Sequence, residues 1–207
     1  MAVLLVGASG LCREVIPVLK EAGRRIIGVL DDRHSLLAPA FFGTPVLGGV
    51  DDIARYPDAE VLVCVGSGAA RVTIVERMGL DTTRFATVID PSVRNPAGYP
   101  VGRGSILLAG VTITADAEIG NHVVAMPQVT ITHDCMIDDF ATLAAGVSLG
   151  GGVSVGRAAY LGMNASVLPG RKIGAEAIVG MGAVVLADVP EAETWAGVPA
   201  KHLGVSS

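Results

Sequence analysis

The chain has 207 residues, of which 51% are hydrophobic and 17% are charged, and its formal net charge is −5. This length is enough for one large domain or two small ones, each with its own core. The acidic balance and the lack of any Lys/Arg cluster argue against a nucleic-acid or anionic-membrane partner, because both require positive charge to neutralise phosphates. We therefore expect small-molecule chemistry in the cytoplasm.

The sequence shows no sign of export, membrane insertion or cross-linking. Apolar stretches such as 141–156 are interrupted by glycine every few residues, and the N-terminus has neither a basic region nor a cleavage pattern. We therefore expect no membrane span and no signal peptide. The three cysteines, Cys12, Cys64 and Cys135, are odd in number and far apart, which argues against a disulfide framework or a zinc site.

The first part of the chain alternates strands with helices. Apolar runs and helical spacing predict strands at 3–6, 26–30, 61–65 and 86–89, and helices at 11–22, around Ile53 and at 72–78. This alternation is typical of a small parallel sheet with right-handed crossovers, an α/β domain of Rossmann-like type. We expect it to occupy residues 1–90 and a second domain to occupy 91–207.

A nucleotide is the natural ligand for this first domain. The turn Gly7-Ala-Ser-Gly10, the pair Asp31-Asp32 and the turn at Gly66 each follow a predicted strand, so they should meet at the carboxyl edge of the sheet. A glycine turn before a helix offers N–H groups to a phosphate, and an acid after the second strand accepts from ribose hydroxyls. The pattern is two glycines short of a full dinucleotide fingerprint, and glycines that only make tight turns explain it equally well.

The second part of the chain carries a six-residue repeat. Fifteen positions spaced by six contain fourteen Val, Leu or Ile residues, and glycine follows seven of them. Strands of sandwiches or barrels vary in length and would not keep one period over ninety residues, so we predict a parallel β-helix of hexapeptide repeats. The positions are Val101, Leu107, Ile113, Ile119, Ala125, Ile131, Ile137, Leu143, Leu149, Val155, Leu161, Val167, Ile173, Val179 and Val185.

His133 is the candidate base in this repeat. It lies outside the inward aliphatic position, and with eighteen residues per coil Gly151 lies one coil away, roughly 4.8 Å as for neighbouring strands. A base beside a backbone N–H suits acyl transfer, because the base takes the proton of the attacking group and the N–H stabilises the oxyanion. Asp134 either orients the imidazole or only forms a turn. His122 lacks a suitable third ligand to form a metal site with His133, so we expect no catalytic metal.

Several motifs together resemble a known family. The chain is similar over nearly its full length to the bacterial sugar acetyltransferases of the NeuD/PglD type. The resemblance rests on Gly7-Ala-Ser-Gly10, Leu30-Asp-Asp32, His133-Asp-Cys135, Leu161-Gly-Met-Asn164 and Gly197-Val-Pro-Ala-Lys201. It implies a left-handed β-helix, a homotrimer, and acetyl-CoA bound in the grooves between neighbouring helices, with the sites shared between subunits.

The resemblance also implies roles for individual residues. His133 would be the general base, Asp134 its acidic neighbour and Gly151 the oxyanion donor, while Met163 and Met181 would contact coenzyme A. The nucleotide of a UDP-, GDP- or dTDP-linked amino sugar would be bound by the N-terminal residues Ser9, Gly10, Leu11, Asp31, Asp32 and Gly66.

This chain departs from the family pattern at a few positions. Thr142 replaces a second histidine and Met126 an asparagine, and Leu11 and Cys12 follow the opening turn in place of histidine and glycine. We hypothesise that the Thr142 hydroxyl binds a coenzyme A amide.

The predicted function is acetyl-CoA-dependent N-acetylation of a nucleotide-linked amino sugar. Three alternatives remain at this point: O-acetylation of a free sugar such as sialic acid, a non-catalytic nucleotide-sugar-binding trimer, and, least favoured, an NAD-dependent oxidoreductase.

Overall fold

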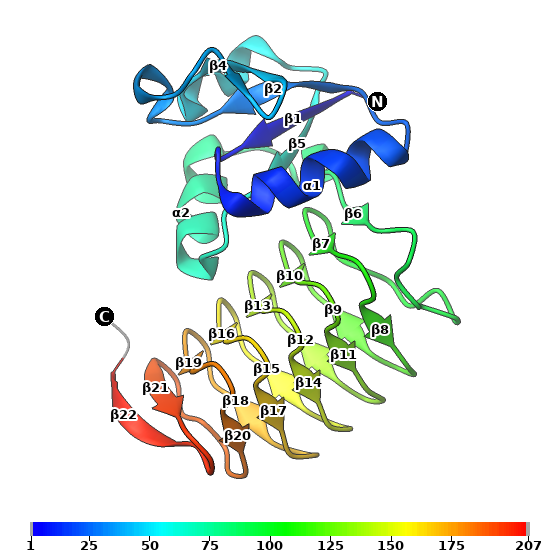
Figure 1. Cartoon of the computed structure of the whole chain (residues 1–207), viewed down its shortest axis with the longest axis vertical. Helices are drawn as coiled ribbons and strands as arrows, with labels where there is room; N and C mark the ends of the chain where they lie inside the picture. Colours follow the sequence, from blue (N-terminus) through cyan, green and yellow to red (C-terminus); the bar gives the residue numbers. More distant parts are fainter. Residues whose placement is uncertain (1, 206–207) are drawn as a thin grey trace.

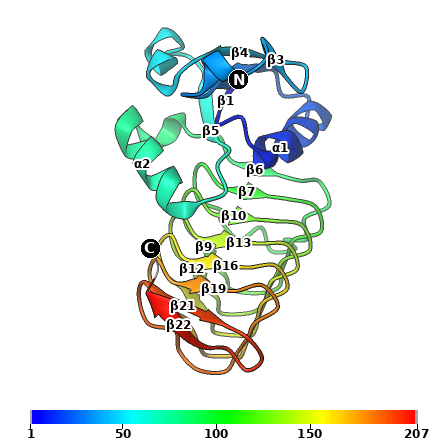
Figure 2. The ribbon, with the colours of Figure 1, turned by 60° about the vertical axis from the view of Figure 1, so that its left-hand side comes forward.

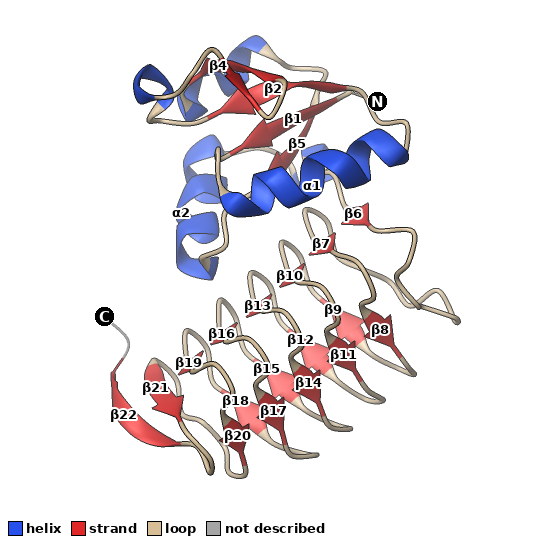
Figure 3. Ribbon diagram, in the orientation of Figure 1, coloured by secondary structure: helices blue, strands red, loops and turns tan. Residues whose placement is uncertain are grey.

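A computed structural model describes residues 2–205, so Met1 and the last two residues of the expected domains lie outside the described part. An α/β unit lies against one side and one end of a long parallel β-helix (Figure 1). Figure 3 shows that nearly all helix belongs to the α/β unit and that short strands build the rest. The division at residue 90 stays a proposal.

The α/β unit is a five-stranded sheet in the order β3-β4-β2-β1-β5. The parallel strands β1, β2 and β5 follow the apolar runs expected from the sequence. An unexpected hairpin of β3 and β4 extends the sheet beyond β2. The elements are β1 (Val3–Val6), α1 (Gly10–Glu21), β2 (Ile26–Leu30), η1 (His34–Leu36), β3 (Ala40–Phe41), β4 (Thr44–Gly48), η2 (Val50–Arg55), β5 (Glu60–Val63), α2 (Gly68–Met78) and η3 (Thr82–Arg84).

The two long helices cover opposite faces of this sheet (Figure 2). The buried side of α1 packs with Val3 and Leu5 of β1, and this core continues into Ile106 and Val124 of the β-helix. The other face of the sheet packs against η2 and α2. Because β5 is the edge strand nearest the β-helix, the ends of β1 and β5 lie close to the junction between the two parts.

The β-helix has three sheets whose strands are parallel and pair with an offset of eighteen residues, except at its C-terminal end, where β21 pairs with β19 at another offset and β22 is antiparallel to β21. The repeated aliphatic positions point inward and form one continuous core, together with the small residues two places before them. The strands are β6 (Val88–Ile89), β7 (Ile106–Leu107), β8 (Thr112–Ile113), β9 (Glu118–Ile119), β10 (Val124–Ala125), β11 (Thr130–Ile131), β12 (Met136–Ile137), β13 (Thr142–Leu143), β14 (Ser148–Leu149), β15 (Ser154–Val155), β16 (Tyr160–Leu161), β17 (Ser166–Val167), β18 (Lys172–Ile173), β19 (Ile178–Val179), β20 (Val184–Val185), β21 (Glu193–Ala196) and β22 (Lys201–Val205).

The segment expected as a strand at 86–89 is divided between the two parts: the Ala86 N–H donates to the Val61 carbonyl of β5 at 2.9 Å, and only Val88–Ile89 form a strand, β6. β6 pairs with β7 of the β-helix, not with a strand of the α/β sheet. Its alternation of apolar residues carries no signal for which neighbour it will pair with. The first coil of the β-helix therefore begins before residue 90.

Candidate active site

His133 lies at a corner of the β-helix, in the turn between β11 and β12. Its side chain is 64% exposed, and its Nδ1 lies 2.7 Å from Oδ2 of Asp134, whose φ of 59° is left-handed. An ionised carboxylate can only accept, so Nδ1 carries the hydrogen of this bond. In the neutral imidazole Nε2 then keeps its lone pair, which is the form that a general base requires.

Gly151 occupies the same corner one coil further along. A Cβ atom at this position would overlap Cε1 and Nε2 of His133, so the imidazole lies directly against the glycine backbone. The neighbouring Gly152 N–H donates to the His133 carbonyl at 2.8 Å and fixes the two turns to each other. Within residues 2–205 no acceptor is found for the Gly151 N–H, which therefore remains available to an oxyanion.

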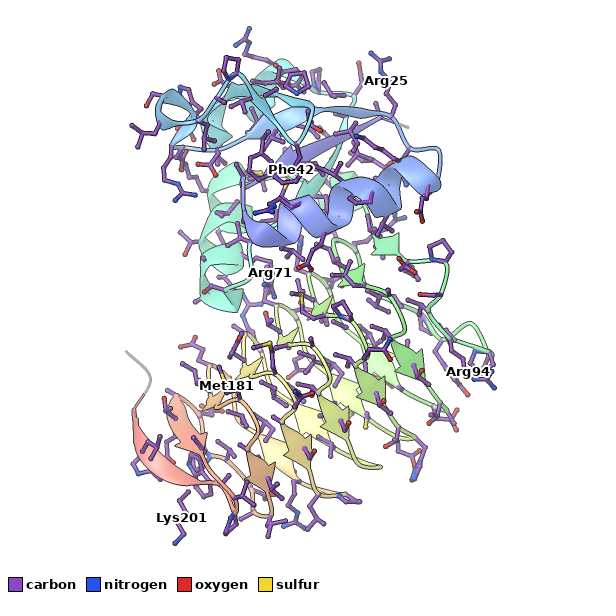
Figure 4. The ribbon with its side chains drawn as sticks, viewed as in Figure 1. Arg25, Phe42, Arg71, Arg94, Met181 and Lys201 are labelled. Atoms are coloured by element: carbon purple, nitrogen blue, oxygen red, sulfur yellow. The ribbon has the colours of Figure 1, made fainter. Side chains whose placement is uncertain are left out.

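Met163 and Met181 lie on a different edge of the β-helix. They follow β16 and β19, at the corner where these strands turn toward β17 and β20. Their side chains are 47% and 72% exposed, and Figure 4 shows Met181 on the outside of the coils. The two methionines share one edge, as expected from their spacing, but the sheet that contains β11, β14 and β17 separates this edge from His133.

The opening turn of the α/β unit presents backbone donors. The Ser9 hydroxyl caps α1 by accepting from Cys12 N–H at 3.3 Å, and it donates to the Cys64 carbonyl at 2.5 Å. No acceptor within the described residues is found for the N–H groups of Gly10 and Leu11. The Leu11 side chain is buried, so this residue can reach a ligand only through its backbone.

Asp31 and Asp32 both follow β2, but their carboxylates have different surroundings. Asp31 is buried and accepts from the N–H groups of Ala8 and Arg33, both at 2.8 Å. Burial opposes its ionisation, yet these hydrogen bonds outweigh burial and lower its pKa. Asp32 is half exposed, and a hydrogen bond from Arg77 at 2.7 Å is the main cause of its lowered pKa. Asp31 thus braces the glycine turn, and Asp32 is the more accessible carboxylate.

Gly66 and Thr142 are brought together at the junction of the two parts. The Thr142 hydroxyl donates to the Gly66 carbonyl at 2.9 Å and accepts from Arg71 at 3.0 Å. The Thr142 side chain is buried and its hydroxyl is engaged. These contacts argue against the coenzyme A contact expected for Thr142, because the hydroxyl has no free face in this structure.

The sequence analysis missed Arg71, which contacts both parts of the chain. It lies on α2, is fully buried, and burial lowers the pKa of its guanidinium to about 10. The only hint in the sequence is an arginine in a run of small residues directly after a strand and a glycine turn.

His122 is a buried neighbour of Arg71. Its ring stacks on Phe140 at 4.8 Å and meets Phe85 edge-on at 4.6 Å. Burial, together with the positive charge of Arg71, lowers the pKa of His122 to about 4. The ring is therefore neutral near pH 7 and belongs to the core of the junction.

Three further observations bear on the sequence predictions. In residues 2–205 no group of three or more His, Cys, Asp or Glu side chains is placed to hold a metal ion. The three cysteines are buried and free. Among the helices of the described chain, none is both long and apolar enough to cross a bilayer.

Comparison with known proteins identifies the relatives of this chain. A family model described as the PglD N-terminal domain matches residues 2–78. A histidine-to-asparagine mutant of perosamine N-acetyltransferase from Caulobacter crescentus, whose crystal structure contains CoA and GDP-perosamine, is 30% identical, with 99% of this chain and 97% of that chain covered and a TM-score of 0.91. The chain belongs to the NeuD/PglD family of sugar acetyltransferases.

Other members of the NeuD/PglD family agree with this assignment. The acetyltransferase domain of PglB from Neisseria gonorrhoeae, solved with acetyl coenzyme A, is 26% identical with a TM-score of 0.89 and 98% of each chain covered. UDP-N-acetylbacillosamine N-acetyltransferase of Bacillus subtilis is 35% identical over 114 residues, 52% of this chain and 51% of that protein. The chain spans about half the length, or less, of the curated relatives it matches. The predicted fold class, an α/β domain followed by a left-handed β-helix, is confirmed.

Proposed function

We propose that this protein transfers the acetyl group of acetyl-CoA to an amino group of a nucleotide-linked sugar. The observation that carries the proposal is the exposed His133, hydrogen-bonded to Asp134 and lying against the backbone of Gly151. Relatives whose structures or names mention CoA, GDP-perosamine or N-acetyltransferase activity support the choice of donor and acceptor class.

The chemistry follows from these three residues. The neutral amine of the sugar attacks the thioester carbonyl, and Nε2 of His133 removes the amine proton as the new C–N bond forms. The oxygen of the tetrahedral intermediate accepts from the Gly151 N–H, while Asp134 stabilises the imidazolium. The intermediate then expels coenzyme A as a thiolate, which takes the proton from His133, and the amide product remains.

The nucleotide is assigned to the carboxyl edge of the α/β sheet. The free N–H groups of Gly10 and Leu11 at the start of α1 and the turn at Gly66 follow the neighbouring strands β1 and β5. Such N–H groups favour a diphosphate, and Asp32 is placed after β2 to accept from ribose hydroxyls. Ser9 and Asp31 contribute by holding the turn in shape.

The site is assigned to two copies of the chain. Within one β-helix, His133 lies on a different edge from Met163 and Met181. One coenzyme A molecule can place its thioester at His133 and contact the methionines only if these edges come from neighbouring protomers. We propose the homotrimer that the family resemblance implies.

Release of free thiol from acetyl-CoA tests the proposal. The acceptors are GDP-perosamine, UDP- and dTDP-linked amino sugars, and free sialic acid, and mass spectrometry identifies the product as an amide or an ester. We expect an amide with at least one nucleotide-linked amino sugar. His133→Ala should lower kcat by about 10²- to 10⁴-fold, the usual contribution of a general base, with little effect on acetyl-CoA binding.

His202→Ala is the matched control, because His202 is an exposed histidine of the last strand, paired with Glu193 and far in sequence from the proposed site. It should keep wild-type turnover. Wild-type turnover in His133→Ala would refute the assignment of the base. An ester of sialic acid as the sole product would instead assign O-acetylation, and binding without any transfer would assign a non-catalytic protein.

A further inference from the structure

Arg71 is a buried cation without a carboxylate partner in the described chain. It projects from the first turns of α2 into the junction between the α/β unit and the β-helix (Figure 4). Its exposed fraction is 0%. Within residues 2–205 the six acceptors of its hydrogen bonds are five backbone carbonyls and one hydroxyl, all uncharged. A buried charge of this kind is costly unless its donors are hydrogen-bonded, and here those hydrogen bonds connect the two parts of the chain.

One side of the guanidinium holds the turn after β5. Nη1 donates to the carbonyls of Val65 and Gly66 at 2.8 and 2.9 Å. In a trans peptide the carbonyl and the next N–H point in opposite directions. The N–H groups of Gly66 and Ser67 are therefore turned away from Arg71, and among the described residues neither has an acceptor.

The other side of the guanidinium holds the β-helix. Nε donates to the His122 carbonyl at 3.1 Å, and Nη2 donates to the Phe140 carbonyl at 2.7 Å and to the Thr142 hydroxyl at 3.0 Å. Thr142 completes the link, because the same hydroxyl donates to Gly66. The contact is close: a Cβ atom on Gly68 would overlap the Phe140 carbonyl.

We propose that Arg71 is a positioning residue of the nucleotide-sugar site: it ties the Val65–Gly66 turn to two coils of the β-helix and so aims the N–H groups of Gly66 and Ser67 at the diphosphate. The inference rests on the proposed function, because it deepens the role of Gly66 there. Arg71 itself touches no substrate, since it is fully buried.

Only arginine can make this set of bonds. Its planar guanidinium has five N–H donors in a fixed fork, whereas lysine has one compact ammonium on a flexible stem. Lysine can reach one side of the junction or the other, but it cannot hold the Val65 and Gly66 carbonyls and the Phe140 carbonyl in their observed places together.

The test compares Arg71→Met and Arg71→Lys with the wild type. Calorimetry with GDP, UDP, dTDP and inorganic pyrophosphate measures nucleotide binding, and steady-state kinetics measure KM for the nucleotide sugar and for acetyl-CoA. We expect the Kd of the bound nucleotide and the KM of the nucleotide sugar to rise about tenfold or more, as for loss of hydrogen bonds to a charged group. The KM of acetyl-CoA and kcat at saturation should change less than about twofold.

Thr142→Val provides a milder variant in case Arg71→Met does not fold. It removes the hydroxyl that links Gly66 to Arg71 with almost no change of shape, and we expect a rise in nucleotide Kd of about three- to tenfold. Thr142→Ser should restore the wild-type Kd. Arg84→Met is the matched control, because Arg84 also binds backbone carbonyls, those of Ala59 and Tyr56, within the α/β unit. It should lower Tm without changing any KM.

The outcomes separate this inference from the proposed function. If folded Arg71→Met or Thr142→Val keeps the wild-type nucleotide Kd, the inference is wrong. It is also wrong if only kcat falls, because a fall in kcat alone indicates that fewer molecules are correctly folded, and Arg71 is then merely structural. If the wild type binds GDP, UDP or dTDP but transfers no acetyl group, the proposed function fails while the calorimetric comparison still decides the role of Arg71. A wild type that binds no nucleotide refutes both.

Discussion

At the residue scale, the corner that carries His133 uses two adjacent glycines for different physical reasons. A Cβ on Gly151 would overlap the imidazole, while its backbone conformation is ordinary. Gly152 has a φ of 69°, in the left-handed region, and only ordinary contact distances around a Cβ. One glycine thus leaves space for the proposed base, and the other allows the chain to turn.

Gly151→Ala should therefore lower activity, and Gly152→Ala should instead lower stability. Gly151→Ala displaces the His133 ring, so we expect kcat for thiol release to fall about 10- to 100-fold with Tm nearly unchanged, because a side chain on the surface can move aside. Gly152→Ala forces alanine into a left-handed conformation, which costs about 1 kcal/mol of stability, but leaves His133 in place. Measurements of kcat and of urea unfolding on both variants test whether activity and stability are affected separately. Equal losses of activity in the two variants would contradict the assignment of Gly151.

Residues whose role depends on neighbours in the sequence or in the repeat could be predicted. Residues whose role depends on contacts between distant parts of the chain could not. His133, Asp134 and Gly151 follow from one motif and a period of eighteen residues, and the structure places them together. Arg71 lies 51 to 71 residues from its partners on the β-helix. No periodicity connects such positions, so the burial of Arg71 and the engagement of Thr142 appear only when the two parts are assembled.

At the scale of elements, strands and helices with a clear hydrophobic periodicity could be predicted, but the strands with which they pair could not always be. β1, β2 and the β-helix strands lie where the apolar pattern puts them. The segment at 86–89 was expected to pair with the α/β sheet, but only its start contacts β5, and β6 pairs with β7 because two apolar residues fit either neighbour. The β3 and β4 hairpin was missed, since its strands are short and partly exposed.

The junction of these elements contains a pH-sensitive group. His122 follows β9, is buried between Phe85 and Phe140, and has Arg71, Arg157 and Asp139 as its charged neighbours. Its pKa is about 4 in the folded chain and returns to its ordinary value of 6.5 on unfolding. Between these values unfolding takes up a proton, so stability is full above pH 6.5 and decreases as the pH falls toward 4.

We predict that this single site lowers the free energy of unfolding by about 3 kcal/mol between pH 6.5 and 4. His122→Asn should be less stable at pH 7 because it removes the stacked ring, but its stability should depend much less on pH in this window. Asparagine tolerates the left-handed φ of 54° at this position. Urea unfolding at several pH values measures the slope. His133→Asn, at an exposed position, should keep the wild-type slope; an unchanged slope in His122→Asn would rule out His122 as the cause.

At the scale of the whole molecule, the β-helix is a three-sided prism, and each of its edges has different functional residues. One edge carries the His133 pair, a second carries Met163 and Met181, and a third, with His122 and Phe140, is covered by the α/β unit. The eighteen-residue period could predict which residues share an edge. It could not tell which edges face each other, because that depends on a second copy of the chain.

If each site combines the His133 edge of one protomer with the methionine edge of its neighbour, two inactive chains should complement each other. His133→Ala supplies an intact methionine edge, and the double variant Met163→Lys, Met181→Lys supplies an intact His133 edge. A cyclic trimer that contains both chains, in either ratio, has both edges intact in one of its sites, about a third of the total. Co-expressed chains with two different tags, purified on both, should therefore release thiol from acetyl-CoA at roughly that fraction of the wild-type rate.

A third chain with His133→Ala and both methionine changes provides the control for this experiment. Mixed with His133→Ala it contains no intact base and should stay inactive, whereas mixed with wild type it should leave some sites complete. If a single protomer supplied both edges, the complementing pair would show no more activity than its two parents, and the shared site would be refuted. Recovery of activity when His133→Ala is mixed with the double methionine variant is sufficient to show that the edges of different protomers meet, because neither chain can supply both edges to one site.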